Sequence, residues 1–234
     1  MRPFLTANWR YLAMLNFAID PGILQPLLPV GTELDFHDGQ TFVSVVGFLF
    51  LDTRVLGLPI PLHRDFEEVN LRFYVRRKSG DEWRRGVVFV RELVPRRAIA
   101  LVARTFYGEP YLALPMRHAL EHKDGRLFVE YQWRRARRWE TLAMTATGEP
   151  QRAGPGSHEE FITEHYWGYT ARGGTCSEYR VEHPRWRLWK AATTKFEADA
   201  ATLYGPQFVD PLNAPAVSGF IAEGSAIQVH QRER

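Results

Sequence analysis

One segment of the sequence alternates polar and apolar residues in a way that could gather chemistry on a single face. Within residues 66–75 the polar side chains Glu68, Asn70 and Arg72 recur at every second position. A β-strand turns successive side chains to opposite faces, so these three would share one face and the intervening apolar residues the other. If this polar face lines the interior of a barrel, its carboxylate and guanidinium must be paired with each other or used in chemistry. A water-exposed polar face backed by an apolar core fits this strand equally well.

Patterns for a metal site or a nucleophile are weaker. On a helix, His118 and His122 would lie on one side with Glu121 nearby, but the turn signal Asp124-Gly125 follows directly and favours an exposed turn. Cys176 would need a neighbouring base to act as a nucleophile, and its strand-like surroundings favour a packed thiol. The sequence contains no G-x-S-x-G elbow, phosphate-binding loop or G-x-G-x-x-G fingerprint. We therefore expect neither a metal nor a cofactor.

The elements that must position these residues are mostly strands. Apolar or alternating segments of strand length cover residues 9–17, 41–51, 66–77, 83–94, 126–138, 141–147, 175–182, 187–196 and 226–230. A hairpin is expected at residues 78–81, and short helices after Asp20, over residues 95–107 and from Ser157 to about His165. This pattern predicts a mainly β (α+β) fold, built as a curved antiparallel sheet or a β barrel with a few short helices at its rim.

Length and composition favour one domain spanning residues 1–234. Hydrophobic residues make up 45% of the 234 residues and aromatic residues 13%, which is enough apolar surface for one sizeable core. The most apolar stretch, residues 42–51, is too short to cross a bilayer, which requires about 20 residues. The single cysteine cannot form an internal disulfide. We expect a cytoplasmic protein without a membrane partner.

Basic residues raise a second possibility. The net charge is +3, and nearly all cations are arginines, concentrated in residues 72–104 and in the run 134–138 beside Trp133 and Trp139. Arginines interleaved with aromatic rings are typical of nucleic-acid binding. They are equally typical of solvated strand faces, which is the simpler interpretation, so a nucleic-acid partner is the weaker prediction.

Several short motifs occur in an order that resembles a known bacterial family. They are Trp9-Arg10, Asp20-Pro21, Leu28-Pro29, residues 31–35, residues 42–48, residues 66–75, Ala103-Arg104 and Pro110-Tyr111. Together they resemble the YqjF-like family over most of the chain, from about Phe4 to Trp186. That family is similar, more distantly, to acetoacetate decarboxylase, and the resemblance implies the fold of that enzyme.

The same resemblance implies a pocket and its residues. Arg10 stands where the decarboxylase has an arginine near the substrate carboxylate, and Glu68 stands for its pocket glutamate. Arg104 ends the segment that precedes the nucleophile motif, and Tyr111 followed by Leu112 replaces the lysine pair of that motif. The resemblance thus implies Glu68 and Tyr111 as candidate catalytic residues, with Arg10 and Arg104 as candidate substrate-binding residues.

The missing lysine changes the chemistry that is expected. Decarboxylation through an imine requires an amine of lowered pKa, and a phenol such as that of Tyr111 cannot form the imine. The four lysines, which lie outside the motif, are Lys78, Lys123, Lys190 and Lys195. We therefore expect that the protein is not a Schiff-base acetoacetate decarboxylase.

Structural roles are open for each of these residues. Arg10 could pair with Glu68, Glu68 could pair with Arg72, and Tyr111 or Arg104 could pack into the wall. Outside the four, Tyr179 and His183 could reach the rim of the same pocket.

Three functional hypotheses follow. The first is a polar pocket for a small carboxylate- or carbonyl-bearing metabolite, with acid–base chemistry such as enolisation or hydration and no Schiff base. The second is a non-enzymatic module that binds a small ligand in the same pocket. The third is an arginine-rich protein associated with nucleic acid. Each is compatible with a homo-oligomer.

Overall fold

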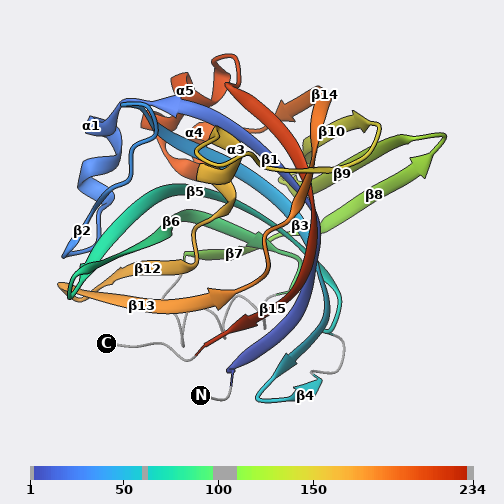
Figure 1. The fold of residues 1–234 in the computed structure, drawn as a ribbon. Coiled ribbons are helices and arrows are strands. Elements are labelled where there is room, and N and C mark those ends of the chain that lie inside the picture. Colours follow the sequence, from blue (N-terminus) through green and yellow to red (C-terminus); the bar gives the residue numbers. More distant parts are fainter. Residues whose placement is uncertain (1–2, 60–62, 97–109, 231–234) are drawn as a thin grey trace.

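Strands dominate the fold, as the sequence predicts. The computed structural model describes residues 3–59, 63–96 and 110–230 (Figure 1). The long strands are β1 (Leu5–Ile19), β3 (Thr41–Val55), β5 (Phe66–Ser79), β6 (Glu82–Val94), β9 (Arg126–Arg135), β10 (Arg138–Thr147), β14 (Arg187–Glu197) and β15 (Ser218–Val229). The shorter strands are β2 (Thr32–Leu34), β4 (Leu58–Pro59), β7 (Tyr111–Ala113), β8 (Met116–Lys123), β11 (Gln151–Arg152), β12 (Trp167–Arg172) and β13 (Thr175–Glu182).

The described helices are short, with four to six residues each. They are α1 (Pro21–Leu24), α3 (His158–Thr163), α4 (Ala200–Tyr204) and α5 (Val209–Asn213), with 3-10 turns η1 (Gln25–Leu27) and η2 (Pro206–Phe208). The side chains of Asp20 and Ser157 cap α1 and α3 as predicted. Most of the helix expected over residues 95–107 lies outside the described residues. No helix of the described chain is long and apolar enough to cross a membrane.

The sheet curves until its pairings form a ring. Neighbouring strands follow the order β1-β3-β5-β6-β12-β13-β15, and β15 pairs with β1 again. Two links in this ring are short, because β6 meets β12 at Gly86 and Val87, and β13 meets β15 only at Val181 and Glu182. The result is a strongly curved sheet rather than a continuous barrel, which decides between the two predicted forms.

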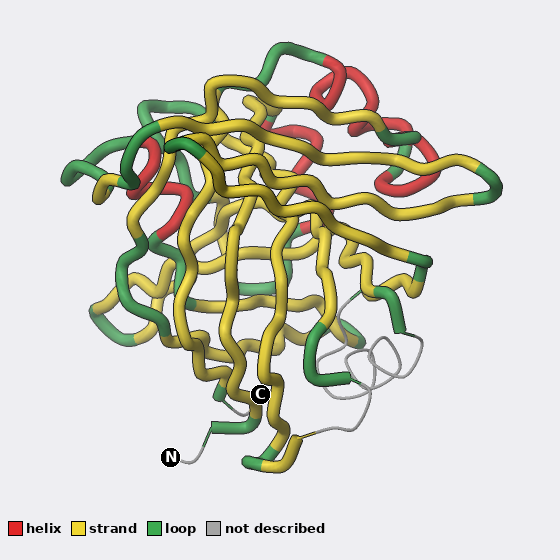
Figure 2. Tube along the Cα trace, turned by 90° about the vertical axis from the view of Figure 1, so that its right-hand side faces the viewer, coloured by secondary structure: helices red, strands yellow, loops and turns green. Residues whose placement is uncertain are grey.

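A second layer packs on the outside of this curve. Strands β14, β10, β9 and β8 continue the sheet beyond β15, and Figure 2 shows strands running in two crossing directions. Gly47 on β3 lets this layer approach, because a Cβ there would lie 2.6 Å from the ring of Tyr131 on β9. The larger apolar core fills the space between the layers, and a second apolar cluster lies on the inner side of the curve.

Two local predictions were wrong. Residues 126–138 do not form one strand, because a two-residue turn with Ala136 at φ 53° folds β10 back so that Arg138 pairs with Arg135. Residues 116–123 form strand β8 instead of an exposed turn, since they pair along the edge of β9. The turn expected at Asp124-Gly125 is confirmed and joins these two strands with φ angles of 52° and 70°.

Candidate functional site

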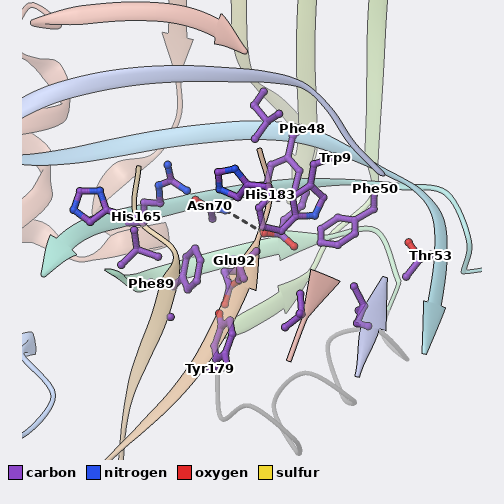
Figure 3. Close-up of a pocket in the computed structure, with 18 of the residues that line it drawn as sticks. Trp9, Phe48, Phe50, Thr53, Asn70, Phe89, Glu92, His165, Tyr179 and His183 are labelled. Carbon is purple, nitrogen blue, oxygen red and sulfur yellow. Dashed lines mark hydrogen bonds between the residues drawn. The ribbon is translucent and has the colours of Figure 1, made fainter. Parts of the chain in front are cut away.

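A cavity of about 160 Å³ lies on the inner side of the curved sheet. Figure 3 shows its side chains converging from several strands, with His165 at one end and Thr53 at the other. Its polar lining comes from residues far apart in the sequence, among them Glu68, Asn70, Arg72, Glu92, Tyr111, His165, Tyr179 and His183. The cavity therefore combines carboxylates, one guanidinium and hydrogen-bonding groups inside a mostly apolar wall.

Strand β5 supplies the polar centre of the cavity. Glu68, Asn70 and Arg72 all line it, whereas the intervening Val69 and Leu71 are fully buried in the core between the layers. The period of two in the sequence thus places the polar face on the interior, as one of the two sequence-based alternatives holds.

Glu68 is a buried carboxyl group with two hydrogen bonds. Glu68 is only 3% exposed. Its carboxyl group accepts hydrogen bonds from Asn70 Nδ2 and from Tyr111 Oη, each at 3.1 Å. Burial raises the pKa of Glu68 to about 7, although the two hydrogen bonds and the charge of Arg72 act in the opposite direction. Glu68 can therefore both take up and release a proton near neutral pH.

Tyr111 reaches this carboxyl group from a neighbouring row of the sheet. Asn70 on β5, Glu92 on β6 and Tyr111 on β7 are successive Cα partners across the three strands. Burial, together with the nearby carboxyl groups of Glu68 and Glu92, raises the pKa of Tyr111 well above its usual range. The phenol therefore stays protonated and acts as a hydrogen-bond donor.

Arg72 is the cation of the cavity. No other arginine and no lysine occurs among the described lining residues. Its Nη2 donates to the carbonyl oxygen of Ile162 at 3.4 Å, while its buried Nε has no hydrogen-bond partner among the described residues. Its charge acts on Glu68 and lowers the pKa of both His165 and His183. An anion entering the cavity would meet this guanidinium.

Two histidines of the lining are held neutral. Burial lowers the pKa of His165 to about 4, and burial likewise lowers the pKa of His183 to about 4. His165 Nε2 lies 3.1 Å from Asp35 Oδ2, and His183 Nδ1 lies 3.0 Å from the carbonyl oxygen of Pro184. The ring of His183 also stacks on Trp186 at a centroid distance of 4.0 Å.

Aromatic rings form the wall at the other end of the cavity. Trp9 makes edge contacts with Phe48 and Phe50 at centroid distances of 5.1 and 5.7 Å, and Phe50 stacks on Phe66 at 4.7 Å. All four line the cavity, together with Trp186. Figure 3 labels Trp9, Phe48 and Phe50 among them. This wall suits the apolar part of a small ligand.

The residues expected at the site are only partly brought together. Glu68 and Tyr111 meet, but Arg10 is absent from the lining, because β1 turns Trp9 inward and Arg10 to the opposite face, where Nη1 donates to the carbonyl oxygen of Gly224 at 3.2 Å. Arg104 lies outside the described residues. Tyr179 and His183, which the sequence left open, both line the cavity.

Sequence reasoning missed Trp9, Glu92 and His165 as lining residues. Glu92 and Phe89 both face the cavity although they are three residues apart, because the pairing of β5 with β6 shifts by one residue between Leu71 and Arg72. Such a bulge leaves little trace in the hydrophobic pattern. The sequence analysis placed Arg72 on the polar face as a possible structural partner of Glu68, and did not assign it as the cation of the site.

The fold is acetoacetate-decarboxylase-like. The chain is similar to acetoacetate decarboxylase from Legionella pneumophila subsp. pneumophila str. Philadelphia 1, with a TM-score of 0.66, 14% identity and coverage of 99% of this chain and 86% of that chain. It is also similar to the enduracididine biosynthesis enzyme MppR complexed with pyruvate, with a TM-score of 0.68, 12% identity and coverage of 100% and 91%. At these identities the likeness establishes the fold alone.

Sequence comparison assigns the family. The model of the DUF2071 family, described as an uncharacterized conserved protein, matches residues 6–226, and the chain belongs to this family. The chain is 30% identical over 188 residues to the uncharacterized protein YqjF of Bacillus subtilis (strain 168), covering 79% of this chain and 74% of YqjF. The predicted YqjF-like family and the decarboxylase-like fold are thereby confirmed.

Proposed function

We propose that the cavity binds a small carboxylate- or carbonyl-bearing metabolite and that Glu68 and Tyr111 carry out acid–base chemistry on it without a Schiff base. The observation that carries this proposal is the state of Glu68, a buried carboxyl group with a pKa of about 7 inside a cavity that also contains Arg72. A pKa close to the working pH is the property that a general base or acid requires.

Each group of the site has a role in this chemistry. Arg72 binds the carboxylate of the ligand through its planar guanidinium, which matches two carboxylate oxygens. Ionised Glu68 removes a proton from the carbon next to the ligand carbonyl, and the electrons of the C–H bond form the double bond of an enolate. Tyr111 turns its hydroxyl from Glu68 to the oxygen that becomes negative and stabilises it. Transfer of that proton from Glu68 to the enolate oxygen gives the enol, and its return to carbon instead restores the carbonyl compound.

Hydrogen-bonding atoms without partners support a polar ligand. Nearly all buried polar atoms in folded proteins have hydrogen-bond partners. Among the described residues, several buried polar atoms without one belong to side chains that line this cavity, namely Trp9 Nε1, Thr53 Oγ1, Asn70 Oδ1, Arg72 Nε and His165 Nδ1. A polar molecule in the cavity would provide the missing partners.

An imine route has no amine in the described cavity. Lys78, Lys123, Lys190 and Lys195 are all exposed and none lines the cavity. The chemistry proposed here therefore relies on proton transfer and on a guanidinium, not on a covalent adduct.

A non-enzymatic ligand-binding module is the second candidate, because Arg72 and the aromatic wall would bind an acid even without proton transfer. One fold neighbour, MppR, is described in complex with pyruvate, a small 2-oxo acid, which favours the same ligand class for both candidates. The two differ in whether Glu68 has a chemical role.

Nucleic-acid binding is less well supported, because the arginines of β5 and β6 have acidic neighbours. Arg76 pairs with Glu33, and both Arg77 and Arg84 pair with Glu178, at N–O distances of 2.6 to 3.1 Å. These pairs neutralise much of the basic face that phosphates would need. The cytoplasmic location and the homo-oligomer stay predictions.

Proton exchange separates the enzyme from the binding module. Pyruvate or 2-oxobutanoate is incubated with the protein in D₂O, and loss of the proton signal beside the carbonyl is followed by NMR. We expect exchange faster than in buffer alone, and no acceleration with Glu68→Gln. Binding of the acid without faster exchange would support the binding module. The absence of both binding and exchange would contradict the proposal.

A further inference from the structure

One end of the cavity holds a hydrogen-bond acceptor that the proposed proton transfer does not use. His165 follows α3 and lines the cavity at the end opposite Thr53 (Figure 3). Its side chain is only 1% exposed, and its ring packs between Tyr74 and Phe161 at centroid distances of 4.7 and 5.2 Å. The ring is therefore held in one position by its neighbours.

A short polar chain decides which ring nitrogen carries the proton. Asp35 Oδ2 lies 3.1 Å from His165 Nε2 and accepts from Arg85 Nε at 2.6 Å. The Arg85 guanidinium and His165 hold the pKa of Asp35 below its usual range despite burial, so this carboxylate is ionised and can only accept. The proton of His165 therefore lies on Nε2, and Nδ1 keeps its lone pair.

Nδ1 is the part of this histidine that is left for a ligand. It is buried and has no hydrogen-bond partner among the described residues. Burial and the charges of Arg85 and Arg72 keep the ring from taking a second proton at neutral pH. A neutral acceptor that is not protonated needs a hydrogen-bond donor from whatever occupies the cavity.

The surroundings favour a neutral donor, such as a hydroxyl group, over a charged one. Arg72 lies close enough for its charge to act on His165, so an ammonium group beside Nδ1 would be repelled. The buried Oδ1 of Asn70, two residues before Arg72 on the same face of β5, also has no partner among the described residues. The guanidinium for an anion thus has neutral acceptors next to it.

We propose that the ligand is a 2-hydroxy carboxylate, whose carboxylate binds Arg72 and whose hydroxyl donates a hydrogen bond to Nδ1 of His165. This inference rests on the proposed function only for the carboxylate site at Arg72, which both candidate functions share. It adds the class of acid that the cavity selects. A 2-hydroxy acid has no ketone carbonyl for Glu68 to enolise, so it is a ligand of the cavity and not the substrate of that step. A 2-oxo acid would place a carbonyl oxygen against the Nδ1 lone pair, and an acid without a substituent at C2 would leave Nδ1 unpaired.

A matched series of acids tests the choice. The two enantiomers of 2-hydroxy-4-methylpentanoate, 4-methyl-2-oxopentanoate and 4-methylpentanoate share carboxylate and tail and differ only at C2. We expect one enantiomer of the hydroxy acid to bind at least about tenfold more tightly than the 2-oxo acid and the unsubstituted acid. A factor of this size is the usual cost of an unpaired buried acceptor. Dissociation constants come from isothermal titration calorimetry of the full chain at pH 7.5.

Two variants assign the preference to His165. His165→Phe retains a flat ring but has no acceptor, so the hydroxy acid should bind no better than 4-methylpentanoate. His165→Asn can present an amide oxygen near the position of Nδ1 and should keep part of the preference, which guards against a variant that does not fold.

The outcomes separate this inference from the proposed function. Equal affinity for all acids that is lost in Arg72→Gln would overturn the hydroxy-acid proposal and leave the proposed function intact. Tightest binding of the 2-oxo acid, or a hydroxyl preference unchanged in His165→Phe, would also overturn it. Binding of no acid at all would contradict both.

Discussion

Tyr111 Oη donates a hydrogen bond of 3.1 Å to Oε2 of Glu68, and this contact joins β7 to β5 across the intervening strand β6. The two residues are 43 positions apart in the chain. Tyr111 stands at the position where the resemblance to acetoacetate decarboxylase implies the lysine motif. A protonated phenol and a carboxyl group of shifted pKa form a donor–base pair in place of an amine, which suits proton transfer rather than imine formation.

Replacing Glu68 should separate chemistry from binding. Glu68→Gln keeps the size and a hydrogen-bonding group but removes the base, and general acid–base catalysis is worth about 10²- to 10⁴-fold. We expect proton exchange in a 2-oxo acid to fall by at least about 100-fold, with little change in the dissociation constant. Glu67→Gln is the matched control, because Glu67 is the neighbouring carboxylate and its Oε1 contacts His118 Nδ1 at 2.7 Å instead. Equal loss in both variants would contradict the role of Glu68.

The pH dependence of exchange should follow Glu68. As a base it must be ionised, and its pKa is raised to about 7, so the rate should increase as pH rises through about 7 and then level off. The measurement is the exchange rate of a 2-oxo acid between pH 5 and 9, corrected for exchange in buffer. A rate that is already constant at pH 5 would show that the active group titrates like an ordinary exposed carboxyl.

Stability should respond to the same titration with a defined sign. The folded-state pKa of Glu68 is raised from 4.5 to about 7, so the folded state binds the extra proton and the contribution of Glu68 to stability is lost as pH rises from about 4.5 through 7. His165 and His183 act oppositely, because their pKa values are lowered from 6.5 to about 4 and stability rises over that window. The stability difference between Glu68→Gln and the wild-type protein isolates Glu68. It should grow in favour of the variant between pH 5 and 8 in chemical denaturation.

Arg72 and Arg10 are alternative assignments for the residue that binds the carboxylate of the ligand. Arg72→Gln should weaken binding of a small acid at least about tenfold, because a charge-assisted contact contributes about 1.5–3 kcal/mol. Arg10→Gln should change binding little, since Arg10 is outside the lining and contacts Gly224. Calorimetric titration of both variants with the same acid distinguishes the positions. The reverse result would restore the assignment of Arg10 that the family resemblance implied.

Acids with longer apolar tails should bind more tightly, because the tail contacts the aromatic wall of the cavity. Burial of each CH₂ group contributes about 0.8 kcal/mol, or roughly fourfold in affinity, until the tail no longer fits. Titrations with acetate, butanoate and hexanoate should show this increase, and Phe50→Ala should reduce it, since Phe50 lines the cavity between Trp9 and Phe66. Affinity independent of tail length would mean that the acid binds elsewhere.

Gly168 should prove necessary for the position of Tyr179. The two residues are partners across β12 and β13, and a Cβ at Gly168 would lie 2.2 Å from the Tyr179 ring. Gly168→Ala should destabilise the fold by about 1–3 kcal/mol and should be tolerated better together with Tyr179→Ala. Gly154→Ala is the control, because nothing lies within 4 Å of its added Cβ. Denaturant titration measures all three variants.

The sequence by itself determined most of the long strands, the turns at residues 78–81 and 124–125 and the polar face of β5, because these depend on neighbours along the chain. The alternation at Glu68, Asn70 and Arg72 reads directly as one face of a strand. The order of motifs was also sufficient for the family and, through it, the decarboxylase-like fold, without deciding between a curved sheet and a barrel. Alternation along a strand puts the neighbours Trp9 and Arg10 on opposite faces but does not say which of them faces inward. The family resemblance implied Arg10.

The tertiary structure alone decided the composition and the chemistry of the site. Whether Trp9 or Arg10 faces inward depends on which side of β1 the curved sheet encloses, and that is set by pairing with distant strands. The contact of His165 with Asp35 spans 130 positions of the chain, so no local pattern could indicate it. The shifted pKa of Glu68 likewise comes from burial, a property of the assembled cavity, because desolvation requires neighbours that the chain brings in from elsewhere.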